Sequence, residues 1–377
     1  MSKVEIMKLG DLENLELIKM GRGNIISKND ILSCPGNFPV YSSSSSNNGE
    51  IGRYGKYMFD DERITWSIDG GGKLFYRNNL RYSVTNVCGW LKVLDNKKIN
   101  TKFLYYLLIN QWSKLIFDYS HKAHPSVIRN EYYVPKIDIK VQEEIVNILD
   151  SFTNLIDALN EELSLRQKQF EYYREKLLTA KCYISVMKPI CELAEDIFSG
   201  ATPSTKIEKY WTNGDIPWMS SGDIHQKTIN DISTFITKKG YDSCSTKMVP
   251  IQSIVIALAG QGKTRGTVGI TNTALCTNQS LCAIVPNKNE IIPKFLFYYL
   301  DKEYDNLRRI SSGDGTRGGL NLQMIRNYII EYPSLDIQQS IVEKLDAFES
   351  LISSLKEEIA LRQKQYEYYR EKLLTFN

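Results

Sequence analysis

The feature that most constrains this chain is an internal repeat of a long, uninterrupted pattern. Residues 165–179 (LRQKQFEYYREKLLT) return at 361–375 (LRQKQYEYYREKLLT) with a single difference. The same offset of 196 residues aligns the stretches that precede them, 145–163 and 341–359. A long match at a fixed offset indicates one structural element present twice, and it predicts an architecture with pseudo-twofold symmetry.

The repeated element has the sequence of a long helix. Neither copy contains Pro or Gly, and both are rich in Leu, Glu, Lys, Gln and Arg, which are good helix formers. Apolar residues recur at alternating steps of four and three, the pattern of a coiled-coil seam. At 1.5 Å per residue, each helix is expected to span about 55 Å. The seam residues are Ile145, Leu149, Phe152, Ile156, Leu159, Leu163, Phe170, Tyr173 and Leu177 in the first copy, and Ile341, Leu345, Phe348, Ile352, Leu355, Ile359, Tyr366, Tyr369 and Leu373 in the second.

One charged position interrupts the seam in both copies, at Arg166 and Arg362. A charged residue in a coiled-coil seam costs stability but can fix the register and the orientation of the partner helix. The alternative is that each side chain reaches to the edge of the seam and places its guanidinium in solvent. Both interpretations are open at this level.

Connectivity predicts that the two helices run antiparallel. The first helix ends near Ala180, and residues 181–336 separate it from the second. If those residues form one compact domain, its two ends lie close together, so the end of the first helix meets the start of the second. We therefore expect an α+β protein with globular domains at 1–140 and 181–336, separated by spacer helices at 141–180 and 337–377 that pack as an antiparallel coiled coil.

The two globular stretches are related to each other. Each has an apolar stretch that predicts a helix, at 101–107 and at 293–299, and each closes with a Pro just before its long helix, at Pro135 and Pro333. Upstream of these landmarks the two sequences diverge. Short β-rich runs, such as 253–258, alternate there with polar, Gly-rich loops.

Divergent loops on duplicated frames suit a protein that reads two different targets at a fixed separation. Reading a DNA sequence requires side chains that hydrogen-bond to base edges, together with Lys and Arg that hold phosphates. The loops are rich in such side chains, although any single loop can equally be a solvated turn. The predicted DNA contacts are Ser43, Ser44, Asn47, Asn48, Arg53, Tyr54, Lys56 and Lys73 in the first stretch, and Thr202, Ser204, Thr205, Lys206, Ser220, Ser221, Lys263, Thr264, Arg265 and Arg317 in the second.

Taken together, these residues resemble the specificity subunits of Type I restriction–modification systems. The second stretch has the family's frequent opening, here Gly200-Ala201-Thr202-Pro203-Ser204, with Ala201 where many relatives have Gly. The first resembles another common version, here Tyr41-Ser42-Ser43 with Thr65-Trp66 and Asp69-Gly70. Both helices end in Leu-Arg-Gln-Lys-Gln and Tyr-Arg-Glu-Lys-Leu-Leu, and the resemblance covers essentially the whole chain.

The resemblance implies two target-recognition domains, each of which reads one half of a split, asymmetric site in double-stranded DNA. It implies that the helical spacer binds two adenine-N6 methyltransferase subunits, which in turn recruit restriction subunits. No cofactor and no catalytic activity are implied for the chain itself. Aromatic and basic residues crowd the helix ends, so we expect partner contacts at Tyr172, Arg174, Tyr368 and Arg370; the alternative is that they pack against the globular domains.

Three rival interpretations remain. The segment 257–264 nearly spells a phosphate-binding P-loop, but the residues after it are strand-like, whereas a P-loop needs a helix N-terminus there. A purely structural coiled-coil protein would explain the helices but not two large domains with divergent loops. The specificity subunit of another restriction class that uses the same module is the closest alternative. Methyl transfer within this chain is not expected, because no Pro-Pro occurs for the tetrapeptide that holds a flipped adenine.

Composition is consistent with a globular DNA reader. The net charge of +3 excludes a polycationic coat protein but not basic residues gathered on one face. Seven cysteines without paired CxxC spacing argue against a disulfide framework or a zinc site, and the three histidines form no metal-ligand set. With no run of about 18 apolar residues to span a membrane, we expect a cytoplasmic protein with reduced thiols.

Overall fold

The protein divides into two compact units, each of which combines a globular part with a share of both long helices. Unit 1 comprises residues 1–161 and 356–377, and unit 2 comprises residues 162–355. The computed structural model describes residues 4–44, 46–78, 81–118, 120–179, 183–260, 263–311 and 319–376. The domain limits expected from the sequence at 140, 180 and 336 stay a prediction.

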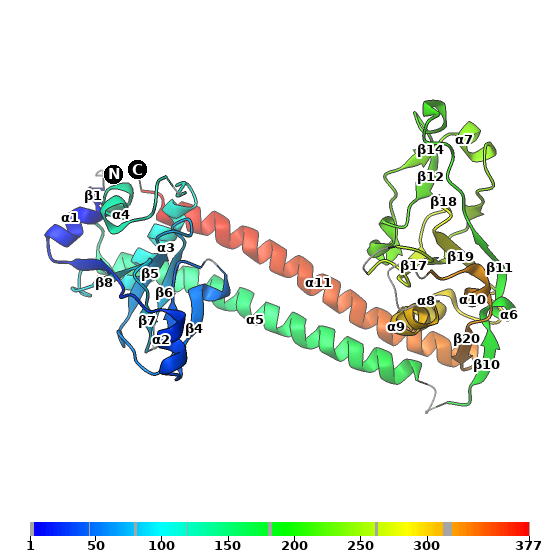
Figure 1. The fold of residues 1–377 in the computed structure, drawn as a ribbon, viewed down its shortest axis with the longest axis horizontal. Coiled ribbons are helices and arrows are strands. Elements are labelled where there is room, and N and C mark those ends of the chain that lie inside the picture. Colours follow the sequence, from blue (N-terminus) through cyan, green and yellow to red (C-terminus); the bar gives the residue numbers. More distant parts are fainter. Residues whose placement is uncertain are drawn as a thin grey trace. The chain divides into compact units, whose positions relative to one another are not determined.

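The two long helices are α5 (Ile139–Leu178) and α11 (Leu335–Leu374), of 40 residues each. Their first residues are 196 positions apart, so the repeat in the sequence is also a repeat in secondary structure. At 1.5 Å per residue each is about 60 Å long. Most of the stability of such a helix comes from packing its apolar stripe rather than from intrinsic propensity. In Figure 1, α5 and α11 are the two longest ribbons.

Unit 1 contains three sheets. The four-stranded sheet has the order β2-β8-β5-β6, the three-stranded sheet β4-β3-β7, and β1 pairs with β9. The strands are β1 (Ile6–Lys8), β2 (Ile18–Arg22), β3 (Phe38–Tyr41), β4 (Glu50–Tyr54), β5 (Arg63–Ser67), β6 (Leu74–Arg77), β7 (Ser83–Val84), β8 (Cys88–Val93) and β9 (Tyr133–Pro135).

Helix α3 packs against the four-stranded sheet of unit 1, as the apolar stretch at 101–107 predicts. Phe103 and Leu107 of this helix are fully buried with Trp66 of β5. The same core takes in Leu149 of α5 and Leu374 of α11, so both long helices are anchored in unit 1. The helices of the globular part are α1 (Leu9–Asn14), α2 (Lys28–Ser33), the 3-10 turn η1 (Asn47–Gly49), α3 (Thr101–Trp112) and α4 (Pro125–Glu131).

Unit 2 contains a five-stranded sheet of order β11-β19-β16-β17-β13, a four-stranded sheet of order β14-β12-β18-β15, and the pair β10-β20. The strands are β10 (Val186–Pro189), β11 (Ala194–Ser199), β12 (Ile216–Met219), β13 (Thr228–Ile229), β14 (Phe235–Ile236), β15 (Met248–Val249), β16 (Ile254–Ala257), β17 (Val268–Thr271), β18 (Leu275–Thr277), β19 (Leu281–Pro286) and β20 (Ile329–Tyr332).

The apolar stretch at 293–299 forms a helix as predicted, and it closes the core of unit 2. Leu296 lies in one buried cluster with Ile254 and Ile284 of the sheet, Leu178 of α5 and Leu345 of α11. The helices of this part are α6 (Ile190–Leu193), the 3-10 turns η3 (Glu208–Tyr210) and η4 (Asp223–Gln226), α7 (Lys238–Asp242), α8 (Pro293–Lys302), α9 (Tyr304–Ile310) and α10 (Leu322–Arg326).

The two units share one sheet topology. The order β2-β8-β5-β6 of unit 1 corresponds to β11-β19-β16-β17 of unit 2, to which β13 is added. The order β4-β3-β7 corresponds to β14-β12-β18, to which β15 is added, and in both cases the central strand pairs parallel with the last one. The duplication that the helices indicate therefore extends through the globular parts, even where their sequences differ.

The antiparallel packing of the long helices is confirmed within each unit. In unit 1, Phe152 near the start of α5 stacks on Tyr369 near the end of α11, with ring centroids 5.3 Å apart. In unit 2, Tyr173 near the end of α5 stacks on Phe348 near the start of α11, at 5.4 Å. These are the same two repeat positions with their roles exchanged. The predicted α+β class with an antiparallel coiled coil is thereby confirmed.

The arginines that interrupt the seam bond along their own helices. Arg166 pairs with Glu162 at 3.3 Å and Arg362 pairs with Glu358 at 3.3 Å, both at a spacing of four residues. Each side chain is 39% exposed. This geometry favours the interpretation in which the arginine reaches the edge of the seam, and the contacts described for it do not fix the register between the helices.

Candidate nucleic-acid interface

A buried glutamine joins each globular part to its long helix. In unit 1, the side-chain oxygen of Gln142 accepts from the backbone N–H of Asn100 at 2.9 Å, and its amide donates to Lys98 O and Ile137 O at 2.9 and 3.0 Å. In unit 2, Gln338 occupies the equivalent position: it accepts from the N–H of Ile292 at 2.8 Å and donates to Pro333 O at 2.9 Å. Because buried polar groups are costly unless they are bonded, each glutamine fixes where its helix leaves the globular part.

A second joint, formed by an aspartate, a tyrosine and a lysine, is also repeated. Asp150 of α5 accepts from Tyr106 Oη at 2.6 Å and from Lys102 Nζ at 2.7 Å. In unit 2, Asp346 of α11 accepts from Tyr298 Oη at 2.7 Å, and Lys294 lies 2.8 Å away. Burial, reinforced by the hydrogen bond to a carboxylate, raises the pKa of both tyrosines. Each tyrosine therefore stays neutral and donates to the carboxylate.

The sequence reasoning did not select these joint residues. The signal that could have found them is the offset of 196, at which Gln142 matches Gln338 and Asp150 matches Asp346. They hold the frame on which the divergent loops are displayed.

In unit 1, the structure brings four of the predicted DNA contacts into one loop between β3 and β4, called here the Ser42 loop (described residues 42–44 and 46–49). Ser43 and Ser44 are half-buried, whereas Asn47 and Asn48 are exposed. The backbone N–H of Ser42 donates to Gly49 O at 2.9 Å, so the loop closes on itself. The two asparagine side chains thus present amide donors and acceptors, the groups that pair with adenine edges in the major groove.

The basic residues predicted in unit 1 lie around this loop. Arg53 and Tyr54 are on β4, which leaves the Ser42 loop, and Lys56 is exposed in the following turn. Arg53 is itself held by Glu50 at 3.0 Å and by Asn37 O at 3.3 Å. The turn that precedes Lys73 also adjoins the loop, because a Cβ placed at Gly70 would lie 2.0 Å from Ser43 O.

In unit 2, the opening motif (residues 200–204) follows β11. Thr202 donates to Gln279 Oε1 at 2.6 Å and is half-buried, whereas Ser204, Thr205 and Lys206 are exposed. The glycine of this opening has a steric role: a Cβ at Gly200 would lie 1.8 Å from Thr277 O of β18.

Unit 1 has the same close approach after its first long strand. A Cβ at Gly23, which follows β2, would lie 1.9 Å from Val84 O of β7. The sequence indicates such a glycine for the second stretch alone. The structure shows that both units have one, at the point where a strand of one sheet passes directly against a strand of the unit's other sheet.

Two tryptophans contact the opening motif of unit 2. Trp211 and Trp218 meet edge to face with centroids 5.1 Å apart, and each donates from its ring N–H to a backbone oxygen of the opening, Ser204 O and Ala201 O. The next predicted pair, Ser220 and Ser221, follows β12 and is half-buried. Ser220 donates to Asp223 Oδ2 at 2.8 Å, which fixes that turn.

The segment that resembles a P-loop is a connection between antiparallel strands. β16 precedes it and β17, its antiparallel partner, follows it, and among the residues described between them, 258–260 and 263–267, no helix begins that could hold a phosphate. The strand-like residues that follow the segment thus form a strand, as expected. Lys263 is exposed and Thr264 half-buried, while Arg265 is 9% exposed and offers the least surface to a duplex. Arg317 lies outside the described residues.

The predicted partner contacts separate into two groups. Tyr172 and Tyr368 are each 60% exposed. Arg174, by contrast, binds Asp301 of the unit 2 globular part at 3.0 Å, and Arg370 lies over the ring of Tyr366 at 5.6 Å. The tyrosines are therefore available to a partner, whereas packing within the unit accounts for Arg174.

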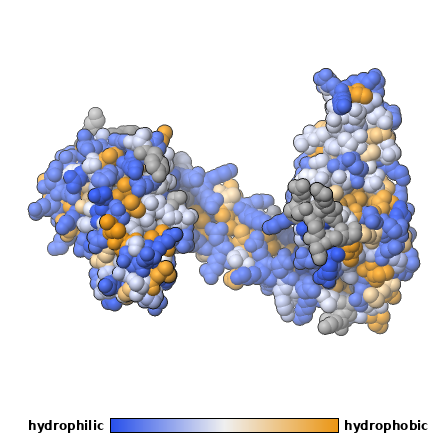
Figure 2. Space-filling view, in the orientation of Figure 1, coloured by the Kyte–Doolittle hydropathy of each residue, from blue (hydrophilic) through white to orange (hydrophobic). Residues whose placement is uncertain are grey.

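Further apolar side chains are exposed near these tyrosines on the long helices. Leu165 is 58% exposed on α5, and Leu361, at the same repeat position on α11, is 64% exposed. Figure 2 shows apolar patches among the hydrophilic surface of the long helices. The two helices thus expose an apolar side chain at the same repeat position.

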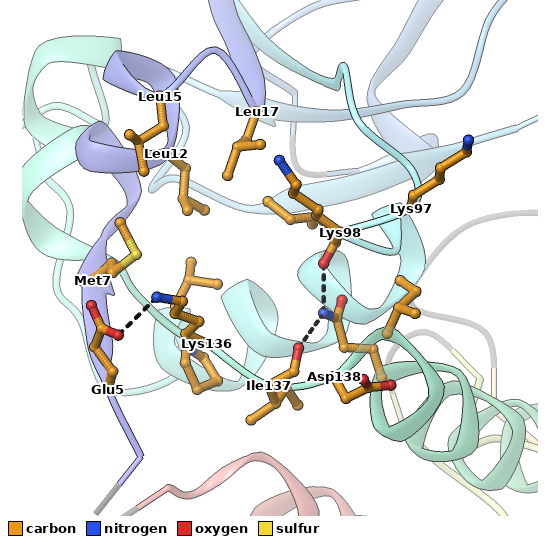
Figure 3. A pocket seen from close by; sticks show the side chains of 15 residues that line it. Glu5, Met7, Leu12, Leu15, Leu17, Lys97, Lys98, Lys136, Ile137 and Asp138 are labelled. Atoms are coloured by element: carbon orange, nitrogen blue, oxygen red, sulfur yellow. Dashed lines mark hydrogen bonds and ion pairs between the residues drawn. The ribbon is translucent and has the colours of Figure 1, made fainter.

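The described residues of unit 1 also line a half-open pocket of about 540 Å³ at the Gln142 joint. Figure 3 shows Met7, Leu12 and Leu17 across from Ile137, with the Lys136–Glu5 ion pair at one side. Gln142 also lines the pocket, and its amide donates to the backbone oxygens of Lys98 and Ile137. No predicted DNA or partner contact lines it, so the pocket belongs to the joint rather than to the reading surface.

Two other features of the described residues bear on function. None of their helices combines the length and apolarity needed to cross a bilayer, and no group of three or more His, Cys, Asp and Glu side chains is placed to bind a metal. The six cysteines among them carry free thiols, and burial raises the pKa of Cys88 and Cys282 to about 12. Cys182 lies outside the described residues.

Comparison with known proteins matches most of the chain to one family. The family model described as "Type I restriction modification DNA specificity domain" matches residues 1–165 and 186–361. The specificity subunit of the Escherichia coli Type I restriction enzyme EcoR124I/EcoR124II is 32% identical over 75% of this chain and 72% of its own length. S.MpnORF507P of Mycoplasma pneumoniae is 30% identical over 95% of both chains.

A solved structure shares the fold. The S subunit of a Type I restriction–modification system from M. genitalium superimposes with a TM-score of 0.63 over 99% of this chain and 96% of its own, at 16% identity. The family model spans the globular parts of both units, and the relatives align over three quarters or more of the chain. The protein therefore belongs to the family of Type I restriction modification DNA specificity domains.

Proposed function

We propose that this chain is the non-catalytic specificity subunit of a Type I restriction–modification complex. Each unit reads one half of a bipartite, asymmetric sequence in double-stranded DNA. The observation that carries the proposal is the contrast within the molecule: the two units repeat one frame, with matched joints at Gln142 and Gln338, but display unlike loops. A duplicated frame with two different reading surfaces suits an asymmetric site with two parts.

The reading chemistry follows from the loops. In unit 1, the exposed amides of Asn47 and Asn48 suit base edges, and Arg53 and Lys56 beside them suit phosphates. In unit 2, the exposed Ser204, Thr205 and Lys206 offer the same combination. Phosphate contacts set the register on the duplex, and the base contacts distinguish sequences, so the two sets have separable effects.

The long helices α5 and α11 provide the surface that binds the partner subunits. Tyr172 and Tyr368 occupy the same repeat position and are equally exposed, so the chain offers one equivalent surface twice. Two copies of one partner are expected on such a pair of surfaces, and we assign them to two adenine-N6 methyltransferase subunits, through which restriction subunits join the complex. The chain itself needs no cofactor, and the complex works in the cytoplasm. The names of the relatives, which are Type I specificity subunits, support this assignment.

The direct test is the methylation pattern. The chain and its methyltransferase are expressed together in a host that lacks adenine methylation, and the modified bases are mapped by sequencing. We expect methylated adenines in a single motif with two specified parts and an unspecified gap. The methyltransferase expressed without this chain serves as the control. Methylation without this chain, or a motif without a gap, would contradict the proposal.

A further inference from the structure

An arginine buried beneath the Ser42 loop is the feature of unit 1 that the proposed function leaves unexplained. Arg77, the last residue of β6, is 1% exposed. Its Nε donates to Thr65 Oγ1 at 3.0 Å, and its Nη2 donates to the backbone oxygen of Asn48 at 2.7 Å. The guanidinium lies 3.5 Å from the centre of the Tyr41 ring, at the end of the strand that enters the loop.

The rings of Tyr41 and Phe75, 3.5 and 4.8 Å from the guanidinium, attract this cation, but within the part of the chain that the structure describes no negative charge is paired with it. Among the described residues no carboxylate forms an ion pair with Arg77, and its Nη1, which is buried, has no hydrogen-bond partner. Burial lowers the pKa of Arg77, but a guanidinium retains its charge in proteins because its pKa is so high. A buried charge with an unused donor is costly for folding, and an apolar residue of similar size would avoid that cost.

The arginine across the sheet provides a contrast. Arg63 is the Cα partner of Arg77 in the β5–β6 ladder and is also buried. It forms two hydrogen bonds with Asp61, at 2.5 and 3.0 Å, and lies 3.6 Å over the ring of Phe59. Arg63 is thus neutralised, and none of its described contacts reaches the Ser42 loop. Of these two arginines, only Arg77 directs a hydrogen bond to that loop.

The loop above Arg77 has a backbone that needs support. Asn47, Asn48 and Gly49 have φ values of 46°, 53° and 81°, three consecutive residues in the left-handed region. Residues other than glycine adopt this region at a cost and keep it only where their surroundings enforce it. Arg77 bonds to the oxygen of the middle residue, and a Cβ at Gly49 would lie 3.4 Å from its Nη2.

We propose that Arg77 is a positioning residue for DNA recognition, which holds the Ser42 loop from beneath so that the side chains of Asn47 and Asn48 face the bases. The inference rests on the proposed function. Arg77 does not touch DNA: it acts through the oxygen of Asn48 and the ring of Tyr41. Its loss alters which bases unit 1 prefers and leaves the choice made by unit 2 unchanged.

The test uses the full chain in complex with its methyltransferase and a pool of DNA duplexes of randomised sequence. Bound duplexes are sequenced for the wild type, for Arg77→Lys and for the matched control Arg63→Lys, and thermal unfolding is recorded for each. The half-site of unit 1 is identified by exchanging residues 1–140 for those of another specificity subunit. For Arg77→Lys we expect selectivity to fall about tenfold or more at one or more base pairs of that half-site.

The other half-site and the length of the gap are expected to stay as in the wild type, and Arg63→Lys is expected to keep both half-sites. If Arg77→Lys retains the wild-type preference, or if Arg63→Lys alters it equally, Arg77 is only a structural residue and the inference fails. Should Arg77→Lys not fold, Thr65→Val, which removes the acceptor of its Nε, decides by the same readout. A wild-type complex that selects no bipartite sequence would instead overturn the proposed function.

Discussion

The two units differ least where they join the long helices and most where they display loops. The joints repeat the same main hydrogen bonds: Gln142 and Gln338 each bond to the backbone that leads into the helix of the globular part, and Asp150 and Asp346 each accept from a tyrosine. The loops do not correspond. Unit 1 supports the Ser42 loop with a buried arginine, and unit 2 supports its opening with two tryptophans.

The joints are the part of each unit that the shared architecture keeps alike. The loops are the part that differs with the target of each unit. A joint has to place a helix at one fixed angle, so the same buried hydrogen bonds serve both units. A reading loop has to match a particular base sequence, and it is stabilised by whatever packs beneath it. Exchanging one unit, lengthening the helices or breaking a joint should therefore have effects of different kinds.

The largest effect is expected from exchanging one globular part. Replacing residues 1–140 with those of another specificity subunit should change one half-site completely and leave the other intact. Each mismatched base pair costs about 1–3 kcal/mol, so binding to the original site should fall by several orders of magnitude. Mapping methylated adenines measures both halves at once. A change in both half-sites would show that the units do not read independently.

Lengthening both helices is expected to change the gap and leave the half-sites unaltered. Inserting four residues after Ser164 and four after Ala360, the same repeat position, adds about 6 Å to each helix. At about 3.4 Å per base pair, the unspecified gap should grow by about one to two base pairs. Insertion of four residues after Asn289, in an exposed turn that holds no predicted DNA or partner contact, is the control. If the methylated motif keeps its original gap, the helices do not set the spacing.

Breaking a joint is expected to destabilise the unit that contains it. Gln142→Leu leaves the N–H of Asn100 and two backbone oxygens without their partner, and Gln338→Leu does the same to the N–H of Ile292 and to Pro333 O. Each change should lower the free energy of unfolding by about 3 kcal/mol, since unsatisfied buried groups cost roughly 1–3 kcal/mol each. Denaturant titration measures the loss.

Gln169, which is only half-buried on α5, allows a matched control, because Gln169→Leu removes a glutamine whose described hydrogen bond is to the side chain of Arg166. That variant should unfold within about 0.5 kcal/mol of the wild type. Equal destabilisation by Gln142→Leu and Gln169→Leu would show that the buried joint has no special role.

The smallest of these effects is expected at the exposed tyrosines. Tyr172→Asp and Tyr368→Asp should each weaken binding of one methyltransferase subunit by about 2 kcal/mol, roughly thirtyfold, because buried aromatic contacts dominate protein interfaces. The stability of the chain should change little, since both side chains are 60% exposed. The mass of the complex gives the stoichiometry. If both variants still bind two subunits with wild-type affinity, the tyrosines are not part of the interface.

The long helices are encoded locally, and their duplication and antiparallel pairing could be predicted from the repeat and from the stretch of chain between the two copies. A pattern of apolar residues at steps of four and three needs a partner helix, and the compactness of the intervening residues gives its direction. The same local logic predicted the helices at 101–107 and 293–299. These inferences succeed because helix periodicity and helix caps are encoded within a few neighbouring residues.

Which polar residues work together is decided by the folded chain and not by any local pattern. Arg77 and Asn48 are 29 positions apart, and Gln142 bonds to Asn100 across 42 positions. In the sequence, Arg77 is one arginine among many, and Arg265 looks as suitable for a phosphate as Lys263, although only the lysine is exposed. Burial and hydrogen bonding depend on strands that are brought together from distant parts of the chain. They therefore cannot be predicted from a few neighbouring residues.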